Sequence, residues 1–224
     1  MQSNTTIVVL ISGNGSNLQS IIDAIESGYL NASIAAVISN NADAYGLHRA
    51  IEHGIDTRVI DHRQFVTRDA FDQELLLCTQ SFDPDYIVLA GFMRILGSAF
   101  IQANRNKILN IHPSLLPCYK GLNTYARALD NNETEHGVSI HIVTVELDDG
   151  PVLIQGRYPI EKGDSAADLA KKGQQLEHQI FPKLLQLIND QRLQISEQSI
   201  LLDQQILRQP IEFELNQTSL DKSP

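Results

Sequence analysis

Short apolar runs alternate with helical patterns along the first 111 residues of the chain. The clearest case is the run Ile7–Ile11, which is followed by Leu18, Ile21, Ile22 and Ile25 at helical spacing. Strands that are buried on both faces read as continuous apolar runs, and their alternation with helices is typical of βαβ units. The sequence therefore predicts an α/β fold with a mostly parallel central sheet and helices on both faces.

The same alternation gives the extent of each expected element. We expect strands at Thr6–Ile11, Ser33–Ile38, Thr57–Ile60, Tyr86–Ala90 and Lys107–Ile111. We expect further helices at Tyr45–His53 and Thr67–Ser81. Glycines at 28 and 54 follow the first two helices and supply the stop that a helix end favours.

The pattern changes after residue 111. Pro113, Pro117 and Gly121 interrupt regular structure and predict an irregular loop, which is a common place for a functional site. Two alternating segments, Gly137–Val143 and Val152–Tyr158, flank a turn and predict an antiparallel hairpin.

A long helix is expected after this hairpin. Ser165 and Asp168 have the spacing of a capping box, and they precede apolar residues at helical spacing. The apolar residues that define the helix are Leu169, Leu176, Ile180 and Leu184.

Length, charge and cysteine content limit the class of protein. A chain of 224 residues fits one large domain, which we expect over residues 1–209, with a polar tail over 210–224. The 17 Lys and Arg against 27 Asp and Glu give a net charge of −10, which disfavours a nucleic-acid partner. Two cysteines, no signal-like N-terminus and no long apolar segment predict a cytoplasmic protein without a membrane partner.

The residues after the first strand form a glycine-rich loop. Ser12–Asn17 reads SGNGSN and lies between a strand and a helix, a layout that directs backbone N–H groups at an anion such as phosphate. Leu18 stands where a dinucleotide fingerprint needs a third glycine, and Ser39-Asn40-Asn41 rather than an acid follows the second strand, so a nicotinamide cofactor is disfavoured. The alternative is an ordinary helix cap formed by Ser16 and Gln19.

Asn110 and His112 lie one residue apart at the end of a strand, so their side chains share one face. That end of a parallel strand is where open α/β sheets bind ligands, and both side chains can donate to a developing oxyanion. The alternative is a core histidine that donates to a backbone carbonyl. Asp148 and Asp149 lie in a turn, and spacing alone selects neither of them.

The histidine spacing predicts no metal site. His136 and His141 are five residues apart in a strand and therefore face opposite sides, while His178 has no partner at zinc spacing.

Four motifs in combination resemble the phosphoribosylglycinamide formyltransferase family from about residue 6 to about residue 200. The motifs are Ser12–Asn17, Ala90–Leu96, Asn110–Pro117 and Leu147–Pro151. The resemblance implies a Rossmann-like formyltransferase fold, with a nucleotide-binding half at about 1–105 and a folate-binding and catalytic half at about 106–209. It implies transfer of a formyl group from 10-formyltetrahydrofolate to the amine of glycinamide ribonucleotide in purine biosynthesis, without a metal, by a monomer or homodimer.

The resemblance also assigns roles to matching positions. Asn110, His112 and Asp148 match the family's catalytic trio. The positions that match the substrate-binding residues are Gly15, Ser16, Asn17 and Glu177. The positions that match the folate pocket are Arg68, Met93, Arg94, Ile95, Leu96, Asn110 and Val143, with the loop from Val143 to Asp148.

The chain departs from the expected pattern at three positions. Asp149 stands where a second glycine is common, and Lys120 and Asn123 follow Pro117. We expect Asp149 to be a solvent-facing turn residue.

Two other classes of function remain open at this point. Relatives with the same Asn-x-His-Pro-Ser motif include methionyl-tRNA formyltransferase and formyltetrahydrofolate hydrolases, although they carry an additional domain. The second class is a non-catalytic nucleotide-binding module that uses the glycine loop alone and leaves the trio unexplained.

Overall fold

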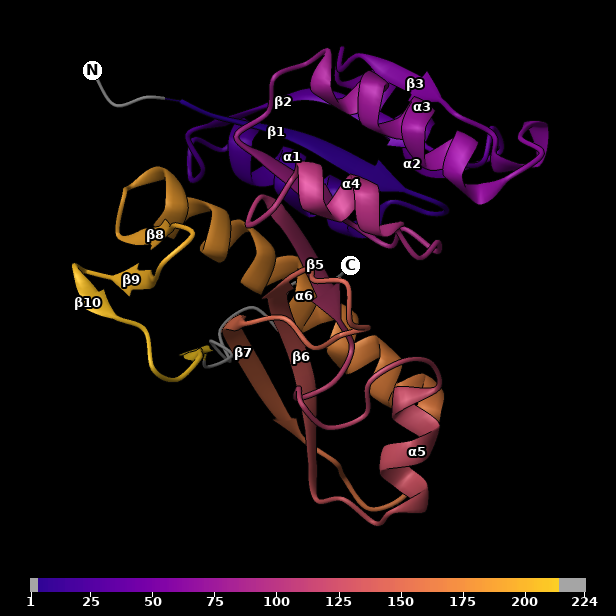
Figure 1. Cartoon of the computed structure of the whole chain (residues 1–224). Coiled ribbons are helices and arrows are strands. Elements are labelled where there is room, and N and C mark those ends of the chain that lie inside the picture. Colours follow the sequence, from indigo (N-terminus) through magenta and orange to yellow (C-terminus); the bar gives the residue numbers. More distant parts are fainter. Residues whose placement is uncertain (1–3, 214–224) are drawn as a thin grey trace.

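Five parallel strands form the first part of a central sheet. The computed structural model describes residues 4–213, and within them the sheet has eight strands in the order β11-β7-β6-β5-β4-β1-β2-β3 (Figure 1). The parallel strands are β1 (Thr5–Ile11), β2 (Ala32–Ser39), β3 (Thr57–Val59), β4 (Tyr86–Leu89) and β5 (Ile108–His112). The mostly parallel sheet predicted from the apolar runs is confirmed.

The second part of the sheet is antiparallel. Strand β6 (Glu135–Ile142) pairs with β5, and β7 (Val152–Pro159) pairs with β6, both in the antiparallel direction. The predicted hairpin is therefore confirmed. In this register the carboxyl end of β6 lies beside the amino end of β5, where the Val143 N–H donates to the Ile108 carbonyl.

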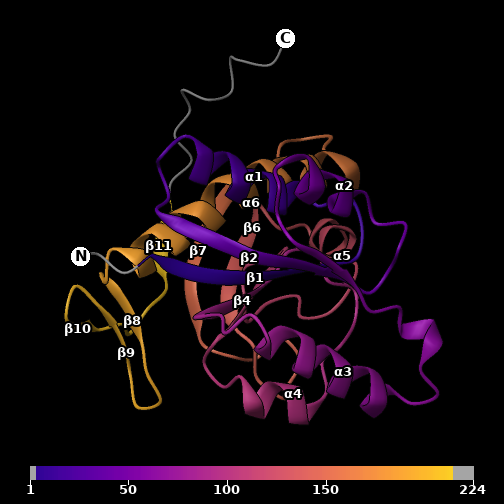
Figure 2. The same cartoon turned by 90° about the horizontal axis from the view of Figure 1, so that it is seen from above.

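Alternate residues of the central strands pack on opposite faces of the sheet. In β1, Ile7, Val9 and Ile11 pack with α1 (Ser16–Glu26), α2 (Tyr45–Glu52) and α6 (Ala166–Asn189). Val8 and Leu10 of the same strand pack with α3 (Arg68–Gln80) and α4 (Ser98–Ala103). Figure 2 shows these two groups of helices on the two sides of the sheet. Burial on both faces explains why the strand reads as an unbroken apolar run.

The predicted capping box at the start of α6 is present. The Asp168 N–H donates to Ser165 Oγ over 3.3 Å, and the Ser165 N–H donates to Asp168 Oδ2 over 2.9 Å. These bonds satisfy two of the donors that a helix N-terminus leaves unpaired. The cap fixes where α6 begins, and α6 then packs against α1 and the β6–β7 hairpin.

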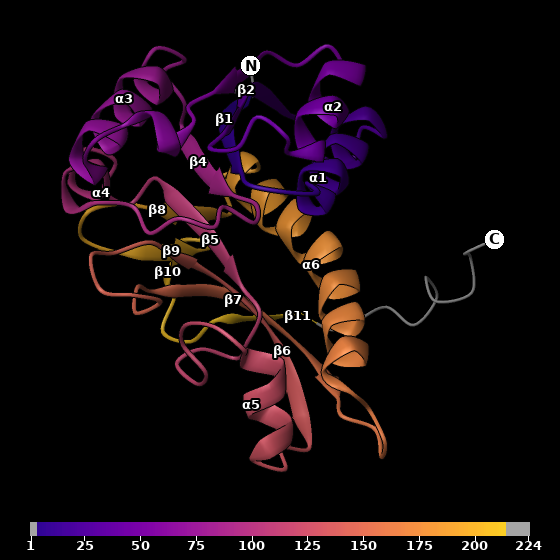
Figure 3. The same cartoon turned by 90° about the vertical axis from the view of Figure 1, so that its right-hand side faces the viewer.

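Several short elements were not predicted from the sequence. Helix α5 (Thr124–Asp130) packs against α6 (Figure 3), and a 3₁₀ turn, η1, spans His62–Gln64. A separate sheet contains β8 (Leu193–Ile195), β9 (Ile200–Leu202) and β10 (Gln205–Ile206). Helix α4 was also missed. Each of these elements has fewer than eight residues, too few to establish a period.

The expected polar tail begins at the wrong residue. Residues Ile211–Phe213 form β11, which pairs in parallel with β7 at the edge of the central sheet. Ile211 and Phe213 are partly buried against the core, because they cover apolar surface beside β7. Residues 214–224 of the expected tail lie outside the described residues. Over residues 4–213 no helix combines the length and apolar character needed to cross a bilayer.

We predict that Ser165→Ala lowers the free energy of unfolding by about 1 kcal/mol, because the N-cap acceptor for the Asp168 N–H is lost. Thermal or denaturant unfolding measures this change. Gln175→Ala on the exposed side of the same helix is the control and should stay within about 0.5 kcal/mol of the unsubstituted chain. Equal effects of the two substitutions would contradict the role of the cap.

Candidate active site

Asn110 and His112 lie at the carboxyl end of β5 on the same face, as the strand alternation predicted. The antiparallel register sets Asn110 opposite His141 and His112 opposite Ser139 of β6. His112 is buried, with 6% of its surface exposed, while Asn110 is half-buried. The two side chains therefore project from one face of the sheet, with the neighbouring strand β6 alongside.

Each ring nitrogen of His112 faces an oxygen. His112 Nε2 lies 2.9 Å from the carbonyl oxygen of Tyr119, and because a carbonyl can only accept, Nε2 carries the proton. His112 Nδ1 lies 3.5 Å from Asp148 Oδ2. The alternative of a core histidine that donates to a backbone carbonyl accounts for Nε2 but not for the carboxylate. The Asp148 carboxylate therefore faces the ring nitrogen that the Tyr119 carbonyl leaves free.

The structure distinguishes between the two adjacent aspartates. The side chain of Asp148 is 10% exposed, and its Oδ2 accepts from the Gly121 N–H over 2.9 Å. Asp148 has φ +49°, so it is the residue of this turn in the left-handed region. Asp149 is 54% exposed and forms an ion pair with Lys120. The expectation of a solvent-facing Asp149 holds in part, since the side chain is exposed but paired.

His141 is a site residue that sequence reasoning missed. Its Nδ1 donates to the Ile142 carbonyl over 3.0 Å, and its Nε2 accepts from Asn110 Nδ2 over 3.0 Å. Burial lowers the pKa of His141, although the Ile142 carbonyl and the nearby Asp148 oppose that shift. The neutral ring orients the Asn110 amide. The strand register is the signal that could have found it, and the sequence alone does not give that register.

The glycine loop forms the turn between β1 and α1. Gly15 is the N-cap of α1 with φ +73°, and a Cβ there would lie 2.7 Å from Gly46 Cα of α2. Glycine is therefore required both by the left-handed backbone and by the close approach of α2. No side-chain hydrogen bond caps α1, so the alternative of an ordinary cap by Ser16 and Gln19 is not what forms. An uncapped N-terminus of this kind suits an anion.

Two residues of α6 meet the start of α1. Asn17 Nδ2 donates to Glu177 Oε2 over 2.8 Å, and Gln174 Nε2 donates to Ser16 Oγ over 3.0 Å. Burial raises the pKa of the Glu177 carboxyl, while the bond from Asn17 opposes the rise. Gln174 was not among the predicted residues. Its helical spacing of three from Glu177 could have indicated it.

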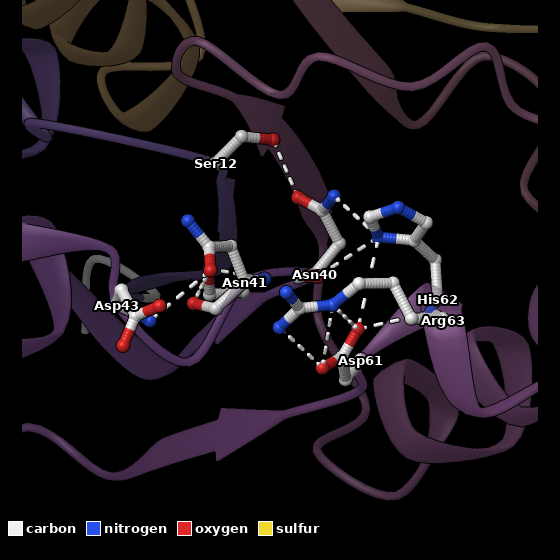
Figure 4. Close-up of polar contacts among 8 residues, drawn as sticks. Ser12, Asn40, Asn41, Asp43, Asp61, His62 and Arg63 are labelled. Carbon is white, nitrogen blue, oxygen red and sulfur yellow. Dashed lines mark hydrogen bonds and ion pairs between the residues drawn. The ribbon is translucent and has the colours of Figure 1, made fainter.

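A polar network ties the loop to the neighbouring strand ends (Figure 4). Ser12 Oγ donates to Asn40 Oδ1 over 2.5 Å and accepts from the Met93 N–H over 2.7 Å. The amide nitrogen of Asn40 lies 3.2 Å from His62 Nδ1. Asn40, which follows β2 in place of a ribose-binding acid, therefore connects to the segment after β4.

Most of the predicted folate residues lie on two loops, while Arg68 begins α3 and Asn110 lies in β5. Met93 and Ile95 follow β4 and are 77% and 65% exposed, while Val145 and Leu147 of the other loop are 56% and 55% exposed. Exposed apolar side chains gathered on neighbouring loops mark a surface for an apolar ligand. Between these loops, the partly buried Val143 packs against the same core cluster as the buried Leu96.

Two arginines border the first of these loops. Arg68 Nη2 donates to the Ile95 carbonyl over 2.7 Å, and the Arg94 guanidinium lies 4.9 Å from the centre of the Phe71 ring. Arg68 Nε lies 3.5 Å from Asp72 Oδ2, and burial raises the pKa of that carboxyl. The two guanidinium groups supply positive charge beside the apolar surface.

A hollow beside the site contains none of the trio residues. It has a volume of about 570 Å³ and is lined by the Val143–Val145 segment, Ile101, Arg105 and residues 196–200. It lies beside the second folate loop. Across residues 4–213, no three His, Cys, Asp or Glu side chains gather in a way that could hold a metal ion.

Known proteins are similar to this chain in sequence and in fold. The formyl transferase family model matches residues 5–185. A phosphoribosylglycinamide formyltransferase of Escherichia coli is 49% identical over 201 residues, which cover 90% of this chain and 95% of the relative. A human trifunctional purine biosynthetic protein, adenosine-3, is 43% identical over 191 residues, covering 85% of this chain and 19% of that protein.

A solved phosphoribosylglycinamide formyltransferase from Coxiella burnetii has the same fold. It is 48% identical, the match covers 94% of this chain and all (100%) of that one, and the TM-score is 0.89. The resemblance found in the four motifs thus extends over the whole sheet. By sequence and by fold, the chain belongs to the formyl transferase family.

Proposed function

We propose that this protein transfers the formyl group of 10-formyltetrahydrofolate to the amine of glycinamide ribonucleotide. The products are formylglycinamide ribonucleotide and tetrahydrofolate, and the reaction belongs to purine biosynthesis. The observation that carries the proposal is the convergence of Asn110, His112 and Asp148 at the end of β5, beside an uncapped glycine loop. Both substrates are small molecules, and the unpaired thiols of Cys78 and Cys118 fit a reducing compartment such as the cytoplasm.

The trio fits the chemistry of formyl transfer. Attack of the amine on the formyl carbon produces a tetrahedral oxyanion, which is stabilised by donors already aimed at it. These donors are the Asn110 N–H that His141 does not use and the N–H at His112 Nδ1, and the Asp148 carboxylate 3.5 Å from Nδ1 holds the ring in position. The proton released by the amine passes through water to N10 of the departing folate. No covalent bond to the protein is needed.

The two substrates have separate places in this scheme. The phosphate of the ribonucleotide binds the N–H groups at Gly15, Ser16 and Asn17, and Glu177 accepts from its sugar hydroxyls. The folate lies between the apolar loops that carry Met93 and Val145, with Arg68 and Arg94 toward its carboxylates. Gln174 lies beside Ser16 and is placed to contact the ribonucleotide.

The test is an assay of the recombinant protein with both substrates. We expect formylglycinamide ribonucleotide and tetrahydrofolate in equal amounts. Formate released without the ribonucleotide would indicate a hydrolase, and formylation of methionyl-tRNA would indicate a different acceptor. Ribonucleotide binding without turnover would indicate a non-catalytic nucleotide-binding module.

We predict that His112→Ala and Asp148→Asn each lower kcat on the order of a hundredfold or more, because each weakens stabilisation of the oxyanion. Since Asp148 acts through His112, the double variant should be little slower than the slower single variant. Steady-state kinetics measures kcat, and thermal unfolding shows that each variant is folded. Losses that multiply in full would mean that the two side chains act independently.

We predict that Glu177→Gln stabilises the protein in a pH-dependent way. Because burial raises the pKa of Glu177 above its ordinary value of 4.5, the folded state binds more protons than the unfolded state between the two values. The stability of the unsubstituted chain therefore falls as pH rises through that window, and the variant escapes this loss. Its Tm advantage should grow as pH rises above 4.5, while its KM for the ribonucleotide rises about tenfold because a charged acceptor is lost. If the plots of Tm against pH ran parallel for the variant and the unsubstituted chain, the raised pKa of the Glu177 carboxyl would be wrong.

A further inference from the structure

Two of the positions that depart from the family pattern contact each other. The Lys120 ammonium forms an ion pair with the Asp149 carboxylate, and the two side chains are 35% and 54% exposed. Lys120 belongs to the loop of residues 117–123, and Asp149 belongs to the turn of residues 146–150. The ion pair therefore joins two segments that are distant in sequence, and one of them contains Asp148.

The two residues that flank Lys120 in the chain each make a hydrogen bond to a catalytic side chain. Tyr119 precedes Lys120, and its carbonyl accepts from His112 Nε2 over 2.9 Å. Gly121 follows Lys120, and its N–H donates to Asp148 Oδ2 over 2.9 Å. Three consecutive residues thus contact His112, Asp149 and Asp148 in turn.

The backbone of both segments is in a conformation that needs support. Tyr119 has φ +57° and Gly121 has φ +77°, while Asp148 in the opposite turn has φ +49°. Non-glycine residues persist in the left-handed region only where surrounding contacts hold them there. A contact between the two segments is such a support.

The 117–123 loop is fastened on its other side by α5. Arg127 Nη1 donates to the Lys120 carbonyl over 2.7 Å, and its guanidinium lies 5.3 Å from the Tyr119 ring centre. Tyr119 Oη donates to Glu133 Oε1 over 2.6 Å. The loop is therefore anchored at its base, and the Lys120–Asp149 pair with the Gly121–Asp148 bond connects it to the turn.

We propose that Lys120 and Asp149 are positioning residues for formyl transfer. Their ion pair holds the 117–123 loop against the 146–150 turn, so that the Tyr119 carbonyl orients His112 while Asp148 faces its Nδ1. This inference rests on the proposed roles of His112 and Asp148. The pair acts through these residues and touches neither substrate.

The test is a charge exchange combined with a double-variant cycle. Lys120→Ala and Asp149→Ala should each lower kcat about threefold to fivefold, the range that an exposed ion pair can supply. The KM for the ribonucleotide should stay unchanged. The double alanine variant should be no slower than either single variant, and Lys120→Asp combined with Asp149→Lys should recover most of the lost kcat.

A salt titration tests the same pair without substitution. At saturating substrates, kcat of the unsubstituted protein should fall toward that of Lys120→Ala as salt rises, because salt screens exposed charges. The double alanine variant should show no such fall. An equal salt response in both proteins would overturn the proposal.

The matched control is the Arg192–Asp203 pair beside the small sheet. Its side chains are 51% and 53% exposed and 2.7 Å apart, so it resembles the Lys120–Asp149 pair in exposure. Exchange of its charges should leave kcat unchanged. Full activity in Lys120→Ala and Asp149→Ala, or an exchanged variant no faster than they are, would overturn this inference while His112→Ala remains inactive. An active His112→Ala would instead overturn the proposed site itself.

Discussion

The antiparallel pairing of β5 with β6 is the constraint on which the site depends. Five parallel strands bring the glycine loop, the segment after β4 and the end of β5 to one edge of the sheet. Strand β6 pairs antiparallel with β5 and sets His141 opposite Asn110, and the loop that follows β6 brings Asp148 to face His112. Without β6 in this place, Asn110 would lack the histidine that accepts from its amide, and His112 would lack its carboxylate.

The same region contains polar groups that are largely buried from solvent. His141 is kept neutral by burial, while the buried Glu177 carries a raised carboxyl pKa. Burial of such groups lowers stability, and the hydrogen bond that each of them makes offsets only part of that cost. The chain therefore gives up some stability where it holds charge and hydrogen-bonding groups in fixed positions for binding and chemistry.

Much of the fold was predictable because long elements have clear periods. The buried strands of the parallel sheet, the hairpin and the capping box at Ser165 all follow from local patterns. Strand β11 was missed because its three residues gain their order from β7, a partner more than fifty positions away. The polar tail was consequently placed too early.

The sequence by itself determined the strand and helix order, the glycine loop, and the shared face of Asn110 and His112, since these depend on residues close together in the chain. The family motif had pointed to Asp148, but only the tertiary structure placed its carboxylate beside His112, brought His141 to Asn110, and paired Lys120 with Asp149. These contacts join separate segments across the sheet edge. Their geometry depends on strand register and on the left-handed turn at Asp148, neither of which a local pattern specifies.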